Sequence, residues 1–110
     1  MNQLTGRELL KLAEGSSSRD FNFEQSVSKV TLDSRKADES CLFVAIRGEN
    51  NDGHAYVSQV VSNPSNFALV DLDFVEELPN LIRVADTTLA LGTLAANYRQ
   101  SFNLPIVAIT

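Results

Sequence analysis

The sequence contains one cysteine, one histidine, one methionine and no tryptophan among its 110 residues. The lone Cys41 cannot form an intrachain disulfide, and a single histidine with no cysteine or carboxylate at ligand spacing predicts no metal site. No apolar run approaches the roughly 20 residues of a membrane span, and the first residues lack the basic and apolar regions of a signal peptide. We therefore expect a cytoplasmic protein without membrane insertion, whose core depends on neither disulfides nor a metal.

Positive charge is also scarce. The 9 lysine and arginine residues stand against 14 aspartate and glutamate residues, so the formal net charge is −5. No basic run is longer than Arg35-Lys36, which argues against a nucleic-acid partner or an anionic membrane surface and leaves room only for a localised anion site. With 44% apolar residues, a chain of this length can bury a real core.

Unbroken apolar runs are what the sequence does have. Residues 41–46 form such a run, which is typical of a strand covered on both faces. Further strands are predicted at residues 27–32, 67–70, 81–84 and 105–110. Helices are predicted from the capping box of Thr5 and Glu8 to Gly15, over residues 55–61, and from the N-cap Asp86 to Phe102. The predicted fold class is α/β, with a small, mostly buried sheet flanked by helices.

Two connections lack these patterns. Residues 16–24 are polar and serine-rich, and we expect them to form a loop that Phe21 and Phe23 anchor to the core. The acidic segment 71–77 is predicted to be a solvated connection rather than a cation site.

The densest polar residues follow two predicted strands, at 33–35 and at 47–54. If these strand ends lie side by side, both loops meet at one edge of the sheet. Such an edge suits a phosphorylated ligand, because Ser34 offers a hydroxyl and Arg35 and Arg47 offer guanidinium groups. An alternative stays open: Asp33 and Asp52 serve as turn or cap residues, the glycines serve tight turns, and Arg35 forms a surface ion pair.

The last predicted strand, residues 105–110, has no turn or cap after it. An apolar strand of this type commonly precedes a phosphate-binding loop, whose glycines and lysine hold a nucleotide. We therefore expect the sequence to be truncated before such a loop and to carry no nucleotide-hydrolysing machinery.

Four segments taken together resemble a known family. They are D-S-R-K at 33–36, C-L-F-V-A-I-R-G-E at 41–49, D-G-H at 52–54 and L-A-A-N-Y-R-Q-S-F-N-L-P-I-V-A-I-T at 94–110. Their order and spacing are similar to the N-terminal region of the Mur ligases of peptidoglycan synthesis, over about residues 27–110. The sequence departs from the family pattern at Glu39-Ser40, where Pro-Gly is common, and at residues 62–66, where Gly-Ala is usual.

The resemblance implies two domains. Residues 1–84 would form the domain that binds the UDP-N-acetylmuramoyl-peptide, and residues 85–110 would begin the central ATP-binding domain. The intact ligase would use ATP and Mg²⁺ to activate the peptide carboxylate as an acyl phosphate, together with its remaining domains. The ATP and Mg²⁺ sites would lie outside these 110 residues, so the chain alone is expected to be inactive and to hold no cofactor.

The segment 94–110 resembles the family members that add D-alanyl-D-alanine to the UDP-linked tripeptide. Two alternatives remain. One is the same domain of the members that add the third residue, diaminopimelate or lysine. The other is of a different class, a non-catalytic binding module for a phosphorylated metabolite or a protein partner.

The resemblance also implies a set of site residues, none of them catalytic and none a metal ligand. The residues expected to bind the UDP moiety are Ser34, Arg47, Gly48, Glu49, Asn50, Asn51 and His54. The residues expected to support these loops are Asp33, Arg35, Asp52 and Gly53.

Overall fold

The computed structural model describes residues 3–49 and 51–98, and the centre of this part is a five-stranded sheet in the order β2-β7-β6-β5-β4. The strands are β2 (Ser16–Ser17), β4 (Lys29–Thr31), β5 (Cys41–Val44), β6 (Phe67–Asp71) and β7 (Leu81–Val84). Strands β4 to β7 run parallel, and β2 pairs antiparallel with β7. The predicted α/β class is confirmed.

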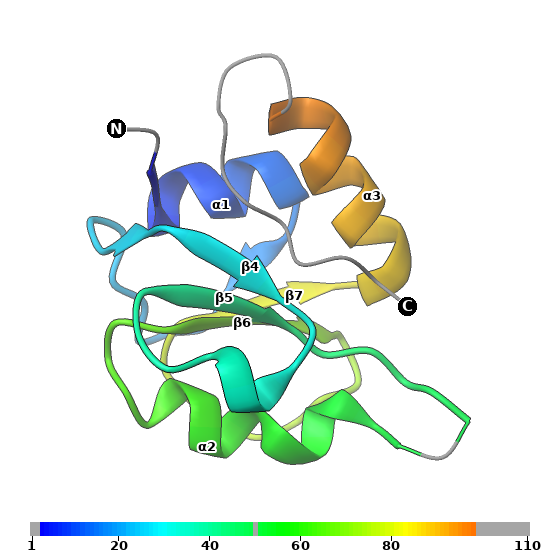
Figure 1. Cartoon of the computed structure of the whole chain (residues 1–110). Coiled ribbons are helices and arrows are strands. Elements are labelled where there is room, and N and C mark those ends of the chain that lie inside the picture. Colours follow the sequence, from blue (N-terminus) through cyan, green and yellow to red (C-terminus); the bar gives the residue numbers. More distant parts are fainter. Residues whose placement is uncertain (1–2, 50, 99–110) are drawn as a thin grey trace.

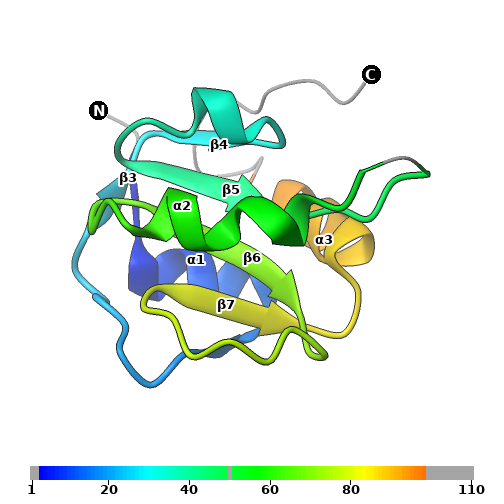
Figure 2. The same cartoon turned by 90° about the horizontal axis from the view of Figure 1, so that it is seen from below.

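Helices cover both faces of this sheet (Figure 1). Helices α1 (Gly6–Ala13) and α3 (Thr87–Tyr98) lie on one face, and α2 (Val57–Val61) lies on the other. Figure 2 shows the sheet from the side of α2, with α1 behind it. Two 3₁₀ turns, η1 (Ser34–Lys36) and η2 (Gly53–Tyr56), follow β4 and β5 respectively. None of the helices in the described ranges has the length and apolarity needed to cross a bilayer.

The central strands divide their side chains between two cores. In β5, Leu42 and Val44 pack on the side of α1 and α3, whereas Cys41 and Phe43 pack on the side of α2. Every residue of β5 and β6 is buried. A sheet covered on both faces requires apolar residues at successive positions, which explains the unbroken run in the sequence.

Helix α1 begins with the predicted capping box. The Thr5 hydroxyl accepts a hydrogen bond from the Glu8 amide at 3.3 Å, and the Glu8 carboxylate accepts one from the Thr5 amide at 2.9 Å. The helix ends at Ala13, two residues before Gly15, because Glu14 takes the left-handed conformation at φ 57°. Gly15 is required for another reason: a Cβ there would lie 2.7 Å from the side chain of Ile82 in β7.

The segment 16–24 is not only a loop, so that prediction was wrong in part. Its first two residues form β2, and Ser18 extends the pairing beyond them. The Ser18 amide donates to the Leu81 carbonyl at 2.9 Å, and its hydroxyl accepts from the Leu81 amide at 3.0 Å. Phe21 is buried as predicted, but Phe23 is 36% exposed and packs against the Phe21 ring at the surface.

The strand predicted over 27–32 is divided between two sheets. β3 (Ser26–Val27) pairs with β1 (Leu4–Thr5) in a separate two-stranded ladder, and β4 then joins the main sheet. The strands predicted at 67–70 and 81–84 are confirmed as β6 and β7.

Helix α3 begins at the predicted position. The Asp86 carboxylate accepts a hydrogen bond from the Leu89 amide at 3.1 Å, as an N-cap does. Its apolar face packs with α1 in one core through Leu91 and Leu94. Phe102 and the strand predicted at 105–110 lie outside the described residues.

Candidate functional site

The two polar loops predicted to share an edge are neighbours. β4 and β5 are adjacent parallel strands in the register Val30↔Leu42 and Thr31↔Phe43. Their carboxyl ends therefore meet at one edge of the sheet, where η1 follows β4 and the segment leading to η2 follows β5. Figure 1 shows the loop after β5 projecting beyond the body of the domain.

A cleft of about 730 Å³ opens between these loops, and we call it the carboxyl-edge cleft. Its volume falls within the range of about 300–1,000 Å³ that is usual for small-molecule sites. The lining is a mixture of apolar and polar residues, so the cleft suits a ligand with both characters. The apolar lining residues are Leu32, Phe43, Ile46 and Tyr56, and the others are Asp33, Ser34, Arg35, Gly48, Asn51 and Gly53.

The loop after β4 is held by Asp33. One carboxylate oxygen of Asp33 accepts from the Arg35 backbone amide at 3.0 Å, which caps η1. The same carboxylate receives two bonds from the Arg35 guanidinium, each 3.0 Å long. The guanidinium lowers the pKa of the Asp33 carboxyl below its ordinary 3.8. Asp33 thus braces the loop and neutralises Arg35, while Ser34 lies between them at the cleft.

The loop after β5 forms a tight turn over residues 47–52, which we call the 47–52 turn. Arg47 and Asp52 pair across its base, and the Gly48 amide donates to the Asn51 carbonyl at 2.7 Å. Gly53 follows, and a Cβ at this position would lie 2.9 Å from the Ile46 backbone nitrogen, so a larger residue would force the turn away from the sheet.

The remaining residues of this turn differ in their places. The Asn51 side chain accepts a bond from the Tyr56 hydroxyl at 3.3 Å and faces the cleft. Glu49 is exposed and does not belong to the cleft lining. Asn50 lies outside the described residues.

Arg47 is not among the residues that line the carboxyl-edge cleft, and its expected contact with the ligand stays a prediction. Its guanidinium pairs with Asp73 at 2.7 Å, with Asp52 at 3.4 Å and with Asp71. The hydrogen bond to Asp73 raises the pKa of Arg47 above its ordinary value, with Asp71 and Asp52 adding to the effect. The positive charge of Arg47, which the sequence pattern assigns to a ligand phosphate, is thus neutralised by carboxylates of the chain itself.

His54 does not line the cleft either. It is 7% exposed, and both ring nitrogens have partners within the chain. Nε2 accepts from the Asp71 backbone amide at 3.0 Å, which leaves the proton on Nδ1, where it donates to Asp52 at 2.8 Å. The two hydrogen bonds of the ring link the 47–52 turn to the end of β6, and the expected contact of His54 with a ligand stays a prediction.

Sequence reasoning missed two residues of this region. Tyr56, the last residue of η2, lines the cleft together with the buried Phe43. Asp71 was assigned to a solvated acidic connection, but it is the last residue of β6 and is 8% exposed. Its position at the end of a buried strand, β6, which pairs with β5, was the available signal.

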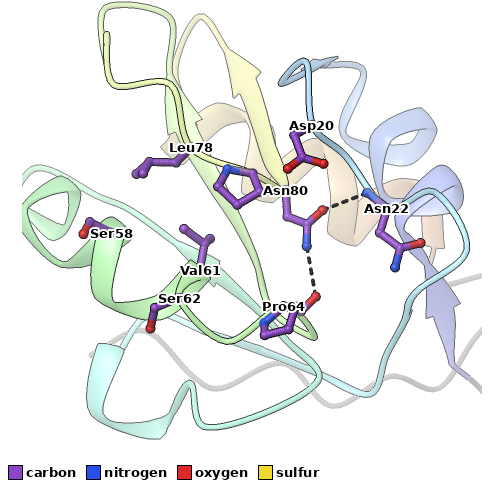
Figure 3. A pocket seen from close by; sticks show the side chains of 9 residues that line it. Asp20, Asn22, Ser58, Val61, Ser62, Pro64, Leu78 and Asn80 are labelled. Atoms are coloured by element: carbon purple, nitrogen blue, oxygen red, sulfur yellow. Dashed lines mark hydrogen bonds between the residues drawn. The ribbon is translucent and has the colours of Figure 1, made fainter.

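A second cleft of about 540 Å³ lies at the opposite edge of the sheet (Figure 3). At its base, Asn80 takes the left-handed conformation at φ 59° and uses its side chain to join three loops. Its amide nitrogen donates to the Pro64 carbonyl at 3.1 Å, and its oxygen accepts from the Asn22 amide at 2.8 Å. These polar groups have partners within the chain, so their role is to hold the loops together. Ligands of parallel sheets commonly bind at the carboxyl edge, which is the other edge of this sheet.

The known proteins that are similar in sequence to this chain are ligases with related names. The chain is 41% identical over 85 residues to the UDP-N-acetylmuramoyl-tripeptide--D-alanyl-D-alanine ligase of Escherichia coli, covering 77% of the chain and 19% of the relative. It is 31% identical over 94 residues to the UDP-N-acetylmuramoyl-L-alanyl-D-glutamate--2,6-diaminopimelate ligase of Cytophaga hutchinsonii, covering 76% of the chain and 18% of the relative. No protein-family model matches the chain.

Solved structures agree with the sequence relatives. A crystal structure of MurF from Acinetobacter baumannii superposes with a TM-score of 0.77 at 33% identity, over 91% of this chain and 22% of that chain. The chain thus spans about a fifth of the length of the relatives that it matches. These likenesses in sequence and in structure identify the chain as a homologue of the N-terminal part of the Mur ligases, similar to MurF in particular.

Proposed function

We propose that this chain is the N-terminal substrate-binding part of an ATP-dependent cytoplasmic ligase that adds D-alanyl-D-alanine to UDP-N-acetylmuramoyl-tripeptide in peptidoglycan synthesis. The observation that carries the proposal is the carboxyl-edge cleft, because it is built by the two loops that contain the D-S-R and D-G-H motifs. This edge of a parallel sheet is the usual place for a nucleotide-containing ligand.

The cleft fits the uridine end of such a substrate. The Tyr56 ring and its apolar neighbours offer a surface for the base, whereas Ser34, Gly48 and Asn51 offer polar contacts for the ribose and the diphosphate. Arg47 and His54 contribute by holding the 47–52 turn in place, since their polar groups are bound within the chain.

ATP and Mg²⁺ belong to the proposal only for the complete ligase. Within residues 3–49 and 51–98, no group of three histidine, cysteine or carboxylate side chains is arranged to hold a metal ion. In the complete ligase, the activation of the peptide carboxylate would belong to the domains that follow. In this proposal residues 1–84 bind the UDP-sugar, and residues 85–110 lead into the ATP-binding domain.

The diaminopimelate-adding ligases are the second candidate, since several of them are 30–32% identical to the chain. Both kinds of enzyme share a UDP-linked sugar, so the cleft alone does not discriminate between them. The affinity of a longer protein for the tripeptide substrate against the dipeptide substrate would do so.

The experiment is an NMR titration of the ¹⁵N-labelled chain with UDP-N-acetylmuramoyl-tripeptide, with UDP and with ATP. We expect saturable shifts of the Ser34, Gly48 and Asn51 amides with both uridine ligands and none with ATP. Replacing Ser34→Ala should weaken UDP binding about two- to tenfold, as expected for the loss of one hydrogen bond.

Ser62→Ala is the matched control, because Ser62 is an exposed serine at the opposite cleft and its loss should leave UDP affinity unchanged. The absence of a response to either uridine ligand in a folded sample would refute the proposed function for this chain. A response confined to the amides of Ser58 and Asn80 would move the site to the other edge.

A further inference from the structure

The Asp71 side chain joins two parts of the molecule that are distant in the sequence. Its carboxylate is 12% exposed, and each oxygen has a different partner. Oδ2 pairs with the guanidinium of Arg47 at the base of the 47–52 turn. Oδ1 accepts from the backbone amide of Thr87, the first residue of α3, at 3.1 Å in a buried contact. The carboxylate therefore bridges the rim of the carboxyl-edge cleft and the start of α3.

Asp71 is connected to the 47–52 turn in two ways. Besides the ion pair, the Asp71 backbone amide donates to His54, whose other ring nitrogen donates to Asp52. Arg47 and Asp52 are the two residues that pair across the base of the turn. Asp71 thus contacts both ends of the turn, one directly and one through the imidazole.

The connection to α3 acts at its N-terminal turn. The Thr87 amide is one of the four amides that a helix leaves without an internal partner, and a carboxylate there is favoured by the helix dipole. Helix α3 in turn packs on α1, and its Asn97 side chain donates to the Leu12 carbonyl at 2.9 Å. A displacement of the first turn of α3 would therefore also disturb the packing of α3 against α1.

We propose that Asp71 is a positioning residue that couples the conformation of the 47–52 turn to the position of the first turn of α3. A buried carboxylate with both oxygens bound cannot follow one partner without losing a charge-assisted bond to the other. Neither element moves independently as long as Asp71 holds both. The functional meaning rests on the proposed function: occupation of the cleft would be transmitted to α3 and to the residues after it.

The first test perturbs the turn and observes the helix. The Arg47→Met variant removes the guanidinium and keeps most of the side-chain length. We expect hydrogen exchange of the Thr87 amide to become about tenfold faster, together with a change in its proton shift, as its acceptor loses its second partner. Arg35→Met is the control, since Arg35 pairs with Asp33 and makes no contact with Asp71 within the described residues. Unchanged Thr87 exchange in Arg47→Met, with faster exchange of the Gly48 amide, would overturn the coupling.

The second test perturbs the helix and observes the turn. Thr87→Pro removes the amide that Asp71 binds, and proline is well tolerated at the first position of a helix. Thr87→Ala is the control, because it removes the buried side chain and keeps the amide. We expect Thr87→Pro, and not Thr87→Ala, to shift the Gly48 and Asn51 amides and to weaken UDP binding about threefold or more.

These outcomes separate the two proposals. If the wild-type chain binds no uridine ligand, the proposed function fails while the exchange and shift measurements still decide the coupling. If the chain binds UDP and Thr87→Pro leaves both the turn amides and the affinity unchanged, the coupling fails and the proposed function stands.

Discussion

Ser40 lies directly before β5 with φ 51°, in the left-handed region that costs a residue with a Cβ about 1–2 kcal/mol. The resemblance to the Mur ligases implies glycine at this position, whereas this chain has a residue with a Cβ in a backbone conformation that favours glycine. We expect Ser40→Gly to stabilise the chain by about 0.5–1 kcal/mol, because relief of strain outweighs the greater freedom of the unfolded chain. Urea denaturation measures the difference.

Ser40→Ala serves as the control for this prediction. The backbone bonds of Ser40, to Ser65 and from Ser28, are retained in both variants. Alanine keeps the Cβ and therefore the strain, so it should not raise the midpoint. A glycine variant no more stable than the alanine variant would contradict the argument.

Asp52 gives a prediction about pH. The His54 backbone amide donates to the Asp52 carboxylate and lowers its pKa below the ordinary 3.8, with the His54 ring and Arg47 contributing. A carboxyl with a lowered pKa in the folded state stabilises the fold at pH values above its unfolded pKa of about 3.9 and loses that contribution as the pH falls through the folded value. Carboxyl ¹³C NMR should therefore show Asp52 titrating below 3.8.

The stability profile provides the check for Asp52. Between about pH 5 and pH 2, the free energy of unfolding should decrease less steeply for Asp52→Asn than for the wild-type chain, since the variant carries no titrating group there. An Asp52 midpoint at or above the ordinary value would contradict this assignment.

At the residue scale, local motifs were predictable and long-range partners were not. The turn and cap roles of Asp33 and Asp52 follow from the preference of aspartate for such positions, and both are observed. The surroundings of His54 and Arg47 depend on Asp71, which lies 17 and 24 positions further along the chain. No spacing rule relates residues brought together only by the pairing of β5 with β6.

Asn66 organises three elements through one buried side chain. Its oxygen accepts from the Cys41 amide at the start of β5 at 2.9 Å, and its nitrogen donates to carbonyls of Ala37 and of Val60 in α2, each at 3.1 Å. Asn66→Ala would leave these buried groups without partners. We expect a loss of about 3 kcal/mol in the free energy of unfolding, at the upper end for unsatisfied buried groups.

Chemical denaturation of Asn66→Ala beside Ser65→Ala tests this prediction. Ser65 is the neighbouring residue and is only half buried, with its hydroxyl accepting from the Ser40 amide, so its replacement should cost about 1 kcal/mol. Equal losses in the two variants would show that Asn66 has no special role in joining the elements.

Among the elements, those with an apolar signature were predicted and those without one were not. β5, β6 and β7 are short, but they are buried on both faces, so hydrophobic runs mark them. β2 consists of two serines, and its pairing with β7 is determined by the fold around it rather than by its own residues. The division of β3 from β4 likewise has no local signal.

The charge of the whole molecule predicts how ligand binding responds to salt. The chain carries a net charge of −5, Arg35 is held by Asp33, and Arg47 is held by three aspartates. Binding that relied on free cations would weaken steeply as salt rises. We expect the affinity for UDP to change less than about twofold between about 0.05 and 0.3 M salt, measured by titration calorimetry.

Uridine is the control ligand for this measurement, because it lacks the diphosphate. Its affinity should be insensitive to salt and should lie within about tenfold of that of UDP if the base and ribose provide most of the contacts. A tenfold loss of UDP affinity over the same salt range, with uridine unaffected, would show that a free cationic group contacts the phosphates.

The short β2 has a consequence for how the molecules behave in concentrated solution. β7 is buried at three of its four residues, and its outer side would otherwise present unpaired amides and carbonyls. β2 together with Ser18 occupies that side. An open edge of this kind invites the strand of another molecule to add to the sheet, which is how aggregation by edge pairing begins. Residues 16–18, which carry no recognisable motif, thus leave only a two-residue strand at this edge of the sheet, and an edge strand that short disfavours pairing with another molecule.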